Sequence, residues 1–543
     1  MTPTTPTIAT PPVRRPLHAR RVRLVVAVVV GGSLLRAGDP FATWNSGGLD
    51  RFTDFFAAAV SPELSADFLA LTWRESLVTL SYAVLGTALA VAIGLVGGAL
   101  LTRRWWETTT DRSTGVGWLA ARATGVLPRS IHEVVWGLLL LNVLGLDPMV
   151  AVLAIGIPFG AITAVVFADV VDERSADAYR ALRSAGAPRV SALAYSLGPD
   201  ARDDLLSYAF YRFECAIRSA AILGIVGAGG LGFQLQLSFT SLRHGEVWTL
   251  LYALIALSGL ADAWSGWVRR RSTGVVAPYA LATSRRAPGG AGAWTVTALA
   301  VGIPVAWWRV GLDPSTLWSS RTRNEAGHVI SSLWPPSLRD GWATLIEQAA
   351  DTVALAVLAL VLAFVAGVAL SLIASGAVGP RGVGGAAVRS VARLVLLVTR
   401  AVPPPVGAIV VLFVIQPGVW PGAIALAIYN LGVLGRLFAE VVENADRTVP
   451  DALLAQGARR TQAVAYATLP EVWGRFTALG LYRWEVAIRE TVVVGVVGAG
   501  GLGRALDDEL SAFAWSKVSG ILLALVAITF AVDLTSGWIR RNR

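Results

Sequence analysis

The chain has 543 residues, of which 55% are hydrophobic and only 15% are charged. Soluble domains usually carry about 25% charged residues, so this composition excludes an ordinary soluble protein and indicates an integral membrane protein. The net charge is +10 and comes almost entirely from arginine, with Lys517 the only lysine. The arginines form short clusters between apolar runs, as in the cytoplasmic loops of membrane proteins, so we expect a lipid bilayer and no nucleic acid as partner.

Cysteine and histidine are too scarce for a multi-cysteine metal site or an internal disulfide. Cys215 is the only cysteine, and the four histidines are scattered along the chain. The segment that begins at His132 and Glu133 has Trp136 where a zinc-protease helix would carry its second histidine. We therefore expect no metal site and no catalytic residues.

Twelve apolar runs can each form a helix that crosses the roughly 30 Å hydrocarbon layer. They follow a stretch rich in threonine, proline and arginine, residues 1–23, that is predicted to be a disordered cytoplasmic tail. A first repeat, 24–268, contains the runs near 22–36, 77–101, 124–146, 149–171, 205–226 and 247–268. After a cytoplasmic linker, 269–292, a second repeat, 293–543, contains the runs near 293–310, 352–374, 391–415, 421–442, 476–498 and 518–539.

The two groups of six runs are copies of one another. Arg212-Phe-Glu-Cys-Ala-Ile-Arg218 recurs as Arg483-Trp-Glu-Val-Ala-Ile-Arg489, and this offset of 271 residues holds without a gap from Arg129 and Arg400 onward. The arginine clusters place both chain termini in the cytoplasm. Since six is even, both copies insert the same way up, and an axis along the membrane normal should relate them.

A glycine-rich run closes the copied region in each repeat. It matches the dinucleotide fingerprint GxGxxG, but that fingerprint needs a βαβ unit, and no alternation of strands and helices surrounds it here. The glycines are instead predicted to allow a sharp bend or close packing of membrane helices. They are Gly227, Gly229, Gly230 and Gly232 in the first copy, and Gly498, Gly500, Gly501 and Gly503 in the second.

Glu214 and Arg218, and likewise Glu485 and Arg489, are four residues apart within apolar surroundings. This spacing puts each pair on one helix face, where its two charges can neutralise each other. One interpretation is a structural ion pair. The other is the lining of an anion pathway, because charged residues inside a membrane are costly and often functional. Arg129 and Arg400 have the same two interpretations, the structural one being a snorkelling anchor.

The segments between the fourth and fifth run of each repeat resemble the EAA loop of bacterial ATP-binding-cassette (ABC) importer permeases, a short helix, a glycine turn and a second short helix. In that family the loop docks into a groove on the ATPase. Neither copy has the leading Glu-Ala-Ala intact, and Gly198 in the first copy stands where leucine is usual, so we expect weaker coupling there. The residues that match the pattern are Ala181, Gly186, Pro199, Asp451, Ala452, Gly457, Leu469 and Pro470.

Together, the copied Tyr-Arg-x-Glu-x-x-x-Arg segment, the glycine run and the EAA-like loop resemble the phosphonate-type family of ABC importer permeases. The resemblance covers residues 75–232 and 350–503. It implies an all-α type I importer permease fold in the inner membrane, with two six-helix family copies fused in one chain so that no homodimer is needed. It also implies two ATP-binding-cassette subunits, which hold ATP and Mg²⁺, and an extracytoplasmic binding protein. The implied substrate is a phosphonate or inorganic phosphate.

The chain has no P-loop of its own, since Lys517 follows Trp515 and Ser516 rather than the glycine that this motif requires. We therefore expect a transport subunit that is not an enzyme and binds no cofactor. An ion-coupled secondary transporter with 6+6 repeats is the alternative, although it would not need two EAA-like loops. A membrane oxidoreductase that uses the glycine fingerprints would need a polar cofactor domain, and the sequence contains none.

Overall fold

The computed structural model describes residues 16–39, 42–107, 115–196, 198–271, 291–338, 341–380 and 382–541. Within these ranges the chain is helical, apart from connecting loops and one isolated antiparallel bridge between Trp44 and Ile415. Helices suit a lipid environment because each backbone N–H and C=O group finds its partner within the helix. Residues 1–15 of the predicted tail and 272–290 of the predicted linker lie outside the described residues.

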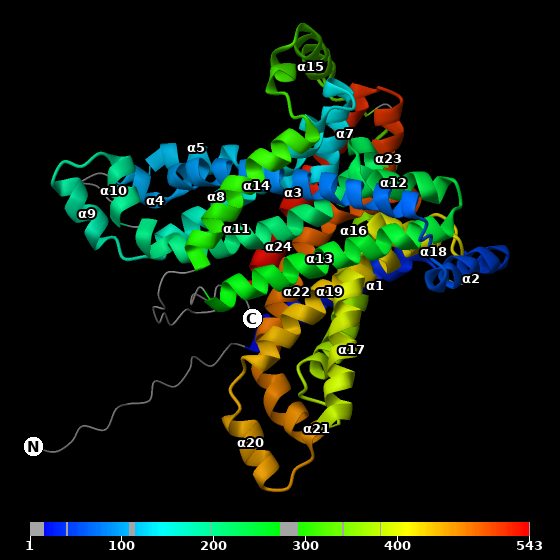
Figure 1. Cartoon of the computed structure of the whole chain (residues 1–543). Helices are drawn as coiled ribbons and strands as arrows, with labels where there is room; N and C mark the ends of the chain where they lie inside the picture. Colours follow the sequence, from blue (N-terminus) through cyan, green and yellow to red (C-terminus); the bar gives the residue numbers. More distant parts are fainter. Residues whose placement is uncertain are drawn as a thin grey trace, which may run out of the picture.

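The first repeat contains the helices up to α13 (Figure 1). The helix α1 begins at Pro16, within the last part of the predicted tail. The helices are α1 (Pro16–Ala37), α2 (Leu49–Ala57), α3 (Ala66–Leu101), α4 (Arg103–Trp106), α5 (Gly115–Thr124), α6 (Val126–Ser130), α7 (Glu133–Leu144), α8 (Pro148–Asp172), α9 (Asp177–Ser184), α10 (Arg189–Ser196), α11 (Gly198–Leu223), α12 (Gly230–Thr240) and α13 (His244–Arg271).

The second repeat contains the helices from α14 onward in the same order, with α15 in the place of α2 and, within the described residues, no counterpart of the short helix α4. They are α14 (Ala291–Val310), α15 (Ser320–Ser332), α16 (Gly341–Ala374), α17 (Gly382–Ala401), α18 (Pro404–Leu412), α19 (Val419–Glu443), α20 (Thr448–Ala455), α21 (Arg460–Ala463), α22 (Leu469–Val494), α23 (Gly501–Ser511) and α24 (Trp515–Arg541).

Seven helices are long and apolar enough to cross a bilayer: α3, α8, α13, α16, α17, α19 and α24. The number rises to ten if three bent pairs each count as one span, namely α5–α6 with α7, α11 with α12, and the run that ends in α22 with α23. The other two predicted runs form α1, whose apolar part is shorter, and α14, and neither is among the ten. The described part of the chain therefore holds seven to ten candidate spans, where the sequence predicts about twelve.

Each repeat is built around a pair of long helices, α3 with α8 in the first and α16 with α19 in the second. Small residues allow the two helices of each pair to approach closely. A Cβ atom added at Gly156 of α8 would lie 2.4 Å from the Leu89 Cδ2 atom of α3, which any larger residue would have to displace. The repeats diverge as two arms, the first ending in α9 and α10 and the second in α20 and α21 (Figure 1). Helices α2 and α15 lie away from both arm tips.

The two repeats exchange their first helices. Val29 and Val30 of α1 pack into the apolar core of the second repeat, where α1 lies along α16. Ala306 of α14 is buried in the core of the first repeat, where α14 lies along α3. An ion pair of 2.7 Å between Arg36 Nε and Asp351 Oδ1 also joins α1 to α16. The first helix of each repeat is therefore buried against the other repeat.

Candidate functional site

A cluster of four charged side chains lies between the repeats. Arg400 of α17 and Arg436 of α19 come from the second repeat, and Glu214 of α11 and Asp262 of α13 come from the first. The Nη1 atoms of both arginines lie 3.4 Å from Glu214 Oε1. Arg400 also pairs with Asp262, whose Oδ1 atom is 3.1 Å from Arg436 Nη1. Two guanidinium groups thus share two carboxylates across the interface.

This cluster is shielded from solvent. The side chains of Glu214, Arg400 and Asp262 are 10%, 12% and 14% exposed, and that of Arg436 is 26% exposed. Buried charges of this kind are tolerated when each has a partner, and removing one partner typically costs about 3–5 kcal/mol because the other charge is left unpaired. The cluster therefore holds the two repeats in one relative position.

A second group of polar side chains surrounds Tyr429 of α19. The guanidinium of Arg218 from the first repeat donates to the Tyr429 hydroxyl at 2.8 Å and lies 5.8 Å from its ring centroid. The guanidinium of Arg483 from the second repeat lies 5.6 Å from the same centroid. Cation–π contacts of desolvated guanidinium groups are worth about 2 kcal/mol or more. One tyrosine thus contacts arginines of both repeats.

Arg483 is held by hydrogen bonds to charged and polar side chains. Its Nη2 atom lies 2.6 Å from Glu490 Oε1, and its Nε donates to Asn430 Oδ1 at 2.6 Å. The Asn430 amide nitrogen in turn lies 3.4 Å from Glu490 Oε2. Arg483, Glu490 and Asn430 are buried, and together they satisfy one another's charge and hydrogen-bonding groups.

Arg212, the copy of Arg483, lies in different surroundings. Its Nε donates to the Tyr208 hydroxyl at 2.9 Å, and its guanidinium lies 5.1 Å from the ring centroid of Phe159. At the offset of 271 residues, Phe159 replaces the asparagine of the second repeat and Ser219 replaces the glutamate. Aromatic rings and a phenol therefore stabilise this arginine where a carboxylate and an amide stabilise its copy.

Arg489 and Arg218 occupy the same position in the two repeats, and neither forms an ion pair with a carboxylate of the described residues. Arg489 donates from Nη1 to the carbonyl oxygen of Arg129 at 2.7 Å. Its Nε atom is buried and has no hydrogen-bond partner in the described part of the chain. The copy of Tyr429 in the first repeat is Pro158, which has no hydroxyl to offer Arg489. Both side chains are half-buried.

The structure pairs the glutamates differently from the sequence expectation. Glu214 forms ion pairs with arginines of α17 and α19 rather than with Arg218 four residues along its own helix. Glu485 lies 2.6 Å from Arg540 Nη1 of α24 rather than beside Arg489. Helices packed against α11 and α22 bring arginines to Glu214 and Glu485. Arg218 and Arg489, four residues further along the same helices, therefore form other contacts. Arg129 lies in α6 and reaches this site through its backbone carbonyl.

The glycine runs coincide with bends. The chain turns by 54° between the segment ending at Ala228 and α12, and by 63° between the segment ending at Ala499 and α23. Gly227 (φ 111°) and Gly498 (φ 99°) have backbone angles that side chains other than hydrogen rarely allow. The set with positive φ is Gly227, Gly229, Gly230, Gly498, Gly500 and Gly501. The remaining two, Gly232 and Gly503, are packed against backbone atoms of the preceding helical segment.

The two EAA-like segments form the same turn. Gly186 and Gly457 each have φ of 87°. The residue after each glycine donates its backbone N–H five residues back, from Ala187 to Leu182 at 3.0 Å and from Ala458 to Leu453 at 3.0 Å. This pattern is a Schellman helix end. Of the other predicted loop residues, Ala181 lies in α9, Asp451 and Ala452 in α20, Pro199 near the start of α11, and Leu469 and Pro470 at the start of α22.

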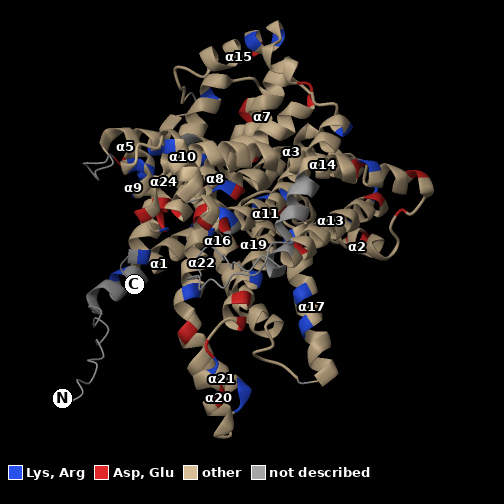
Figure 2. Cartoon of the chain, turned by 60° about the vertical axis from the view of Figure 1, so that its left-hand side comes forward, with Lys and Arg blue, Asp and Glu red and all other residues tan. Residues whose placement is uncertain are grey.

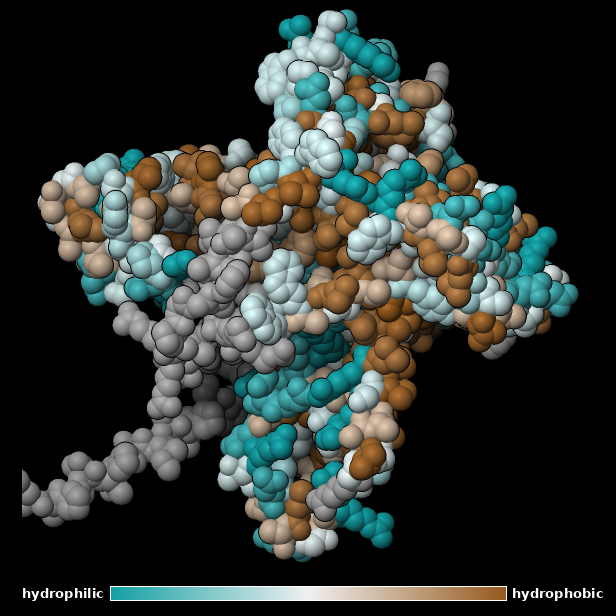
Figure 3. All heavy atoms as spheres, in the orientation of Figure 1, coloured by the Kyte–Doolittle hydropathy of each residue, from teal (hydrophilic) through white to brown (hydrophobic). Residues whose placement is uncertain are grey.

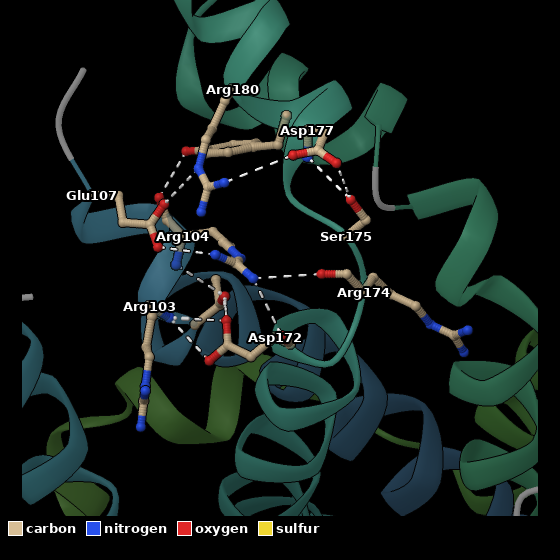
Figure 4. Close-up of polar contacts among 10 residues, drawn as sticks. Arg103, Arg104, Glu107, Asp172, Arg174, Ser175, Asp177 and Arg180 are labelled. Atoms are coloured by element: carbon tan, nitrogen blue, oxygen red, sulfur yellow. Dashed lines mark hydrogen bonds and ion pairs between the residues drawn. The ribbon is translucent and has the colours of Figure 1, made fainter. Parts of the chain in front are cut away.

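The first of these loops is anchored by α4 (Figure 4). The Tyr179 hydroxyl of α9 donates to the Arg104 carbonyl at 2.8 Å, and burial raises the pKa of this tyrosine. Glu107 Oε1 lies 3.0 Å from Arg104 Nη1, and its Oε2 lies 3.7 Å from Arg180 Nε. Asp172 accepts the backbone N–H of Arg103 at 3.1 Å. Side chains from α4, α8 and α9 thus form one network.

The second loop has a polar anchor at its start. Asp446 accepts from the side chain and backbone of Thr448, which lowers the pKa of the aspartate, and donates its own N–H to Glu471 Oε1 at 3.1 Å. At the offset of 271 residues, Pro450 stands where the first loop has its anchoring tyrosine.

Sequence reasoning missed Asp262, Arg436 and Tyr429. Asp262 lies in an apolar run and has a copy, Asp533, at the same offset. A charged residue that recurs within apolar runs could have indicated a functional position. Arg436 interrupts an apolar run where the first copy has Val165, so its lack of a copy hid it. Nothing in the sequence indicates that Tyr429 would meet arginines from both halves.

Comparison with known proteins identifies the family. Residues 119–274 and 367–542 each match the model of the binding-protein-dependent transport system inner membrane component. The chain is 28% identical to the phosphate-import permease protein PhnE of Mycolicibacterium smegmatis over 85% of this chain and 84% of that protein. It is 31% identical to the phosphite transport system permease protein PtxC of Stutzerimonas stutzeri over 44% of this chain and 84% of that protein.

Among solved structures, a chain of the inward-facing MetNI methionine ABC transporter is similar at 16% identity and a TM-score of 0.34, covering 38% of this chain and 98% of that one. The two family matches cover most of both repeats, as the copied motifs predicted, and they favour an ATP-driven importer over an ion-coupled transporter. The chain belongs to the family of binding-protein-dependent transport system inner membrane components, and it contains two copies of that family's permease unit.

Proposed function

We propose that this chain alone forms the transmembrane pathway of an importer for a phosphorus oxyanion, either phosphate or a phosphonate. The observation that carries the proposal is the pair Arg218 and Arg489, which occupy matching positions in the two repeats without a carboxylate partner among the described residues. The unpartnered Nε of Arg489 leaves a donor available for an anion. The names of the relatives, a phosphate-import and a phosphite permease, support this class of substrate.

Arginine suits such a role because its planar guanidinium donates two parallel hydrogen bonds to the oxygens of a phosphate group. An anion in a low-dielectric layer also needs positive charge close to it. Arg218, with the Tyr429 hydroxyl, and Arg489 would contact the anion in turn or together. The cluster of Arg400, Arg436 and the two acidic residues would hold the repeats in register around it.

The energy would come from two ATP-binding-cassette subunits, which hold ATP and Mg²⁺ and dock on α9–α10 and α20–α21. An extracytoplasmic binding protein would deliver the anion at the opposite side. Both arm tips and both chain termini would then lie in the cytoplasm, with residues 24–268 and 293–543 as the two permease units and 269–292 as their linker. This chain itself would bind no cofactor. Closure of the ATPases would bring the diverging arms together.

Uptake of labelled phosphate, phosphite and methylphosphonate by cells that express the chain with its ATPase subunits tests the proposal. Arg489→Gln and Arg218→Gln should abolish uptake at matched membrane levels, and Arg489→Lys should restore only part of it because it keeps the charge and loses the fork. Arg475→Gln, at an exposed position of α22, is the matched control. Uptake of all three anions at the wild-type rate in both Gln variants would remove these arginines from the pathway.

Native mass spectrometry tests the assembly. We expect one copy of this chain for each pair of ATPase subunits, since both loops and both exchanged first helices are already present in it. Two copies of this chain per ATPase pair would contradict the proposal. Uptake that persists without any ATPase subunit and stops with a protonophore would instead support the ion-coupled alternative.

A further inference from the structure

The tip of the second arm carries a pocket that is separate from the site between the repeats. Its volume is about 230 Å³, and it lies between the loop that joins α16 to α17 and the helices α20 and α21. Three arginines line it: Arg389 of α17, Arg447 immediately before α20 and Arg460 at the start of α21. Ribbon segments of basic residues, in blue, lie on α17 and around α20 and α21 in this arm (Figure 2).

These arginines have no acidic partner within the described ranges, although acidic residues lie close in sequence. Glu443 is paired with Arg393, whose Nη2 atom is 2.7 Å from Glu443 Oε1. Asp446 accepts hydrogen bonds from the hydroxyl and backbone of Thr448 at 2.6 and 2.9 Å. Three positive charges therefore line one concave surface while Glu443 and Asp446 are engaged elsewhere.

The first arm has acidic and aromatic side chains in the corresponding segment, after its first long helix. There the segment after α3 carries Glu107, which pairs with Arg104 and Arg180 (Figure 4). Trp118 of α5 lies under two further guanidinium groups, 5.5 Å from Arg103 and 4.8 Å from Arg122. The first repeat thus supplies its own carboxylate and its own rings to its basic side chains.

The corresponding segment of the second repeat, residues 375–382, is rich in glycine and has no acidic residue. Gly376 leaves room for Arg389, since a Cβ atom added there would lie 2.8 Å from the Arg389 Cδ atom. Gly379 and Gly382 line the pocket, and apart from their chain neighbours and the adjoining backbone of α17 no heavy atom of the described residues lies within 4 Å of where their Cβ atoms would be. Glycines therefore replace the bulky and acidic side chains, and the space stays open.

We propose that this pocket binds a phosphate group, which takes the place that Glu107 fills in the first arm. Charge-assisted hydrogen bonds from three guanidinium groups suit the oxygens of a phosphate. The group would connect α17, through Arg389, with α20 and α21, through Arg447 and Arg460. A phosphate group bound in the pocket would then fix the position of the second loop relative to α17. This consequence rests on the proposed docking role of α20 and α21. The binding of phosphate to the pocket does not rest on that role.

Two sources supply this chemistry, a free oxyanion and the headgroup of an anionic lipid. The neighbouring face of α17 is apolar and open, with Val383 and Val391 exposed by 89% and 60%. Figure 3 shows this brown surface along α17 next to the teal surface toward α20 and α21. A lipid with its chains on α17 and its headgroup in the pocket fits this layout, and so does inorganic phosphate from solution.

The experiment uses the purified full chain in nanodiscs of phosphatidylcholine, with and without phosphatidic acid. Inorganic phosphate is titrated by calorimetry in a background that carries both Arg218→Gln and Arg489→Gln, so that binding to the pathway arginines is not counted. Arg447→Gln and Arg460→Gln each remove one guanidinium group from the pocket, and Arg475→Gln removes an arginine of the same arm that does not line the pocket. Native mass spectrometry of each variant counts retained phosphatidic acid.

Arg447→Gln and Arg460→Gln should each weaken binding about tenfold or more, since a hydrogen bond to a charged group is worth roughly 1.5–3 kcal/mol, whereas Arg475→Gln should not. Phosphate binding that is equal in both kinds of disc identifies the free oxyanion. Phosphatidic acid that stays bound and blocks phosphate identifies the lipid headgroup. If both pocket variants bind phosphate and retain phosphatidic acid as Arg475→Gln does, the pocket is not a phosphate site, whatever the uptake assays show.

Discussion

The first repeat holds Arg212 against aromatic rings and a phenol, whereas the second repeat holds the matching Arg483 against a carboxylate and an amide. The loops differ in the same way. A network around Glu107 anchors the first loop, and the second loop lies beside an open basic pocket. The glycine turns of the loops and the bends at the glycine runs agree between the two repeats, so the backbone has kept its symmetry there while the polar contacts have not. Fusion of the two copies makes this possible, because each copy then changes independently.

The largest effect should come from the charged cluster between the repeats. Asp262→Asn leaves Glu214 as the one carboxylate that Arg400 and Arg436 share, although Arg436 keeps its ion pair with Glu440, and we expect a loss of about 3–5 kcal/mol in the free energy of unfolding. The sequence copy of this residue, Asp533, is exposed, so Asp533→Asn should cost less than about 1 kcal/mol. Unfolding in SDS measures the loss of stability in both variants. Equal losses would mean that the interface is symmetric after all.

The two matching arginines should differ as well. Arg483→Gln leaves the buried Glu490 without its cation and should cost about 3–5 kcal/mol. Arg212→Gln removes contacts with aromatic rings and leaves no carboxylate unpaired there, so we expect about 2 kcal/mol. The double variant Arg483→Gln with Glu490→Gln should recover part of the first loss. If Arg212→Gln proves the more damaging change, the contrast between the two surroundings is wrong.

Much of the fold could be predicted because repetition and apolar length are visible in a sequence. The bends of the chain fall at the glycine runs, and the glycine turns of the loops are visible as well, since glycine is the residue that positive φ favours. The exchange of α1 and α14 could not be predicted, because an apolar helix carries no mark of which core it joins. Nor could the partners of Glu214, since they come from helices about 190 to 220 residues away.

A smaller effect tests the shared turn of the loops. Valine at Gly457 or Gly186 is strained at φ of 87°, and a side chain in such a region costs of order 1–3 kcal/mol. The strain should be similar in both loops, so unfolding should not distinguish them. Substrate-stimulated ATP hydrolysis by the assembled transporter should fall more with Gly457→Val, because the first loop departs further from the EAA pattern. Equal losses of ATP hydrolysis would contradict this asymmetry in coupling.

The smallest effect concerns the anchor of the first loop. Tyr179→Phe keeps the buried ring and removes the hydrogen bond to the Arg104 carbonyl, so we expect a loss of about 1 kcal/mol, local to α9. Hydrogen exchange should accelerate about fivefold in α9 and α10 and stay unchanged in α20 and α21, where Pro450 stands in place of the tyrosine. The same measurement on Glu107→Gln shows whether the carboxylate contributes separately. Equal exchange in the wild-type arms would mean that α4 does not stiffen the first loop, and that the polar network of Figure 4 has no role in the difference between the two arms.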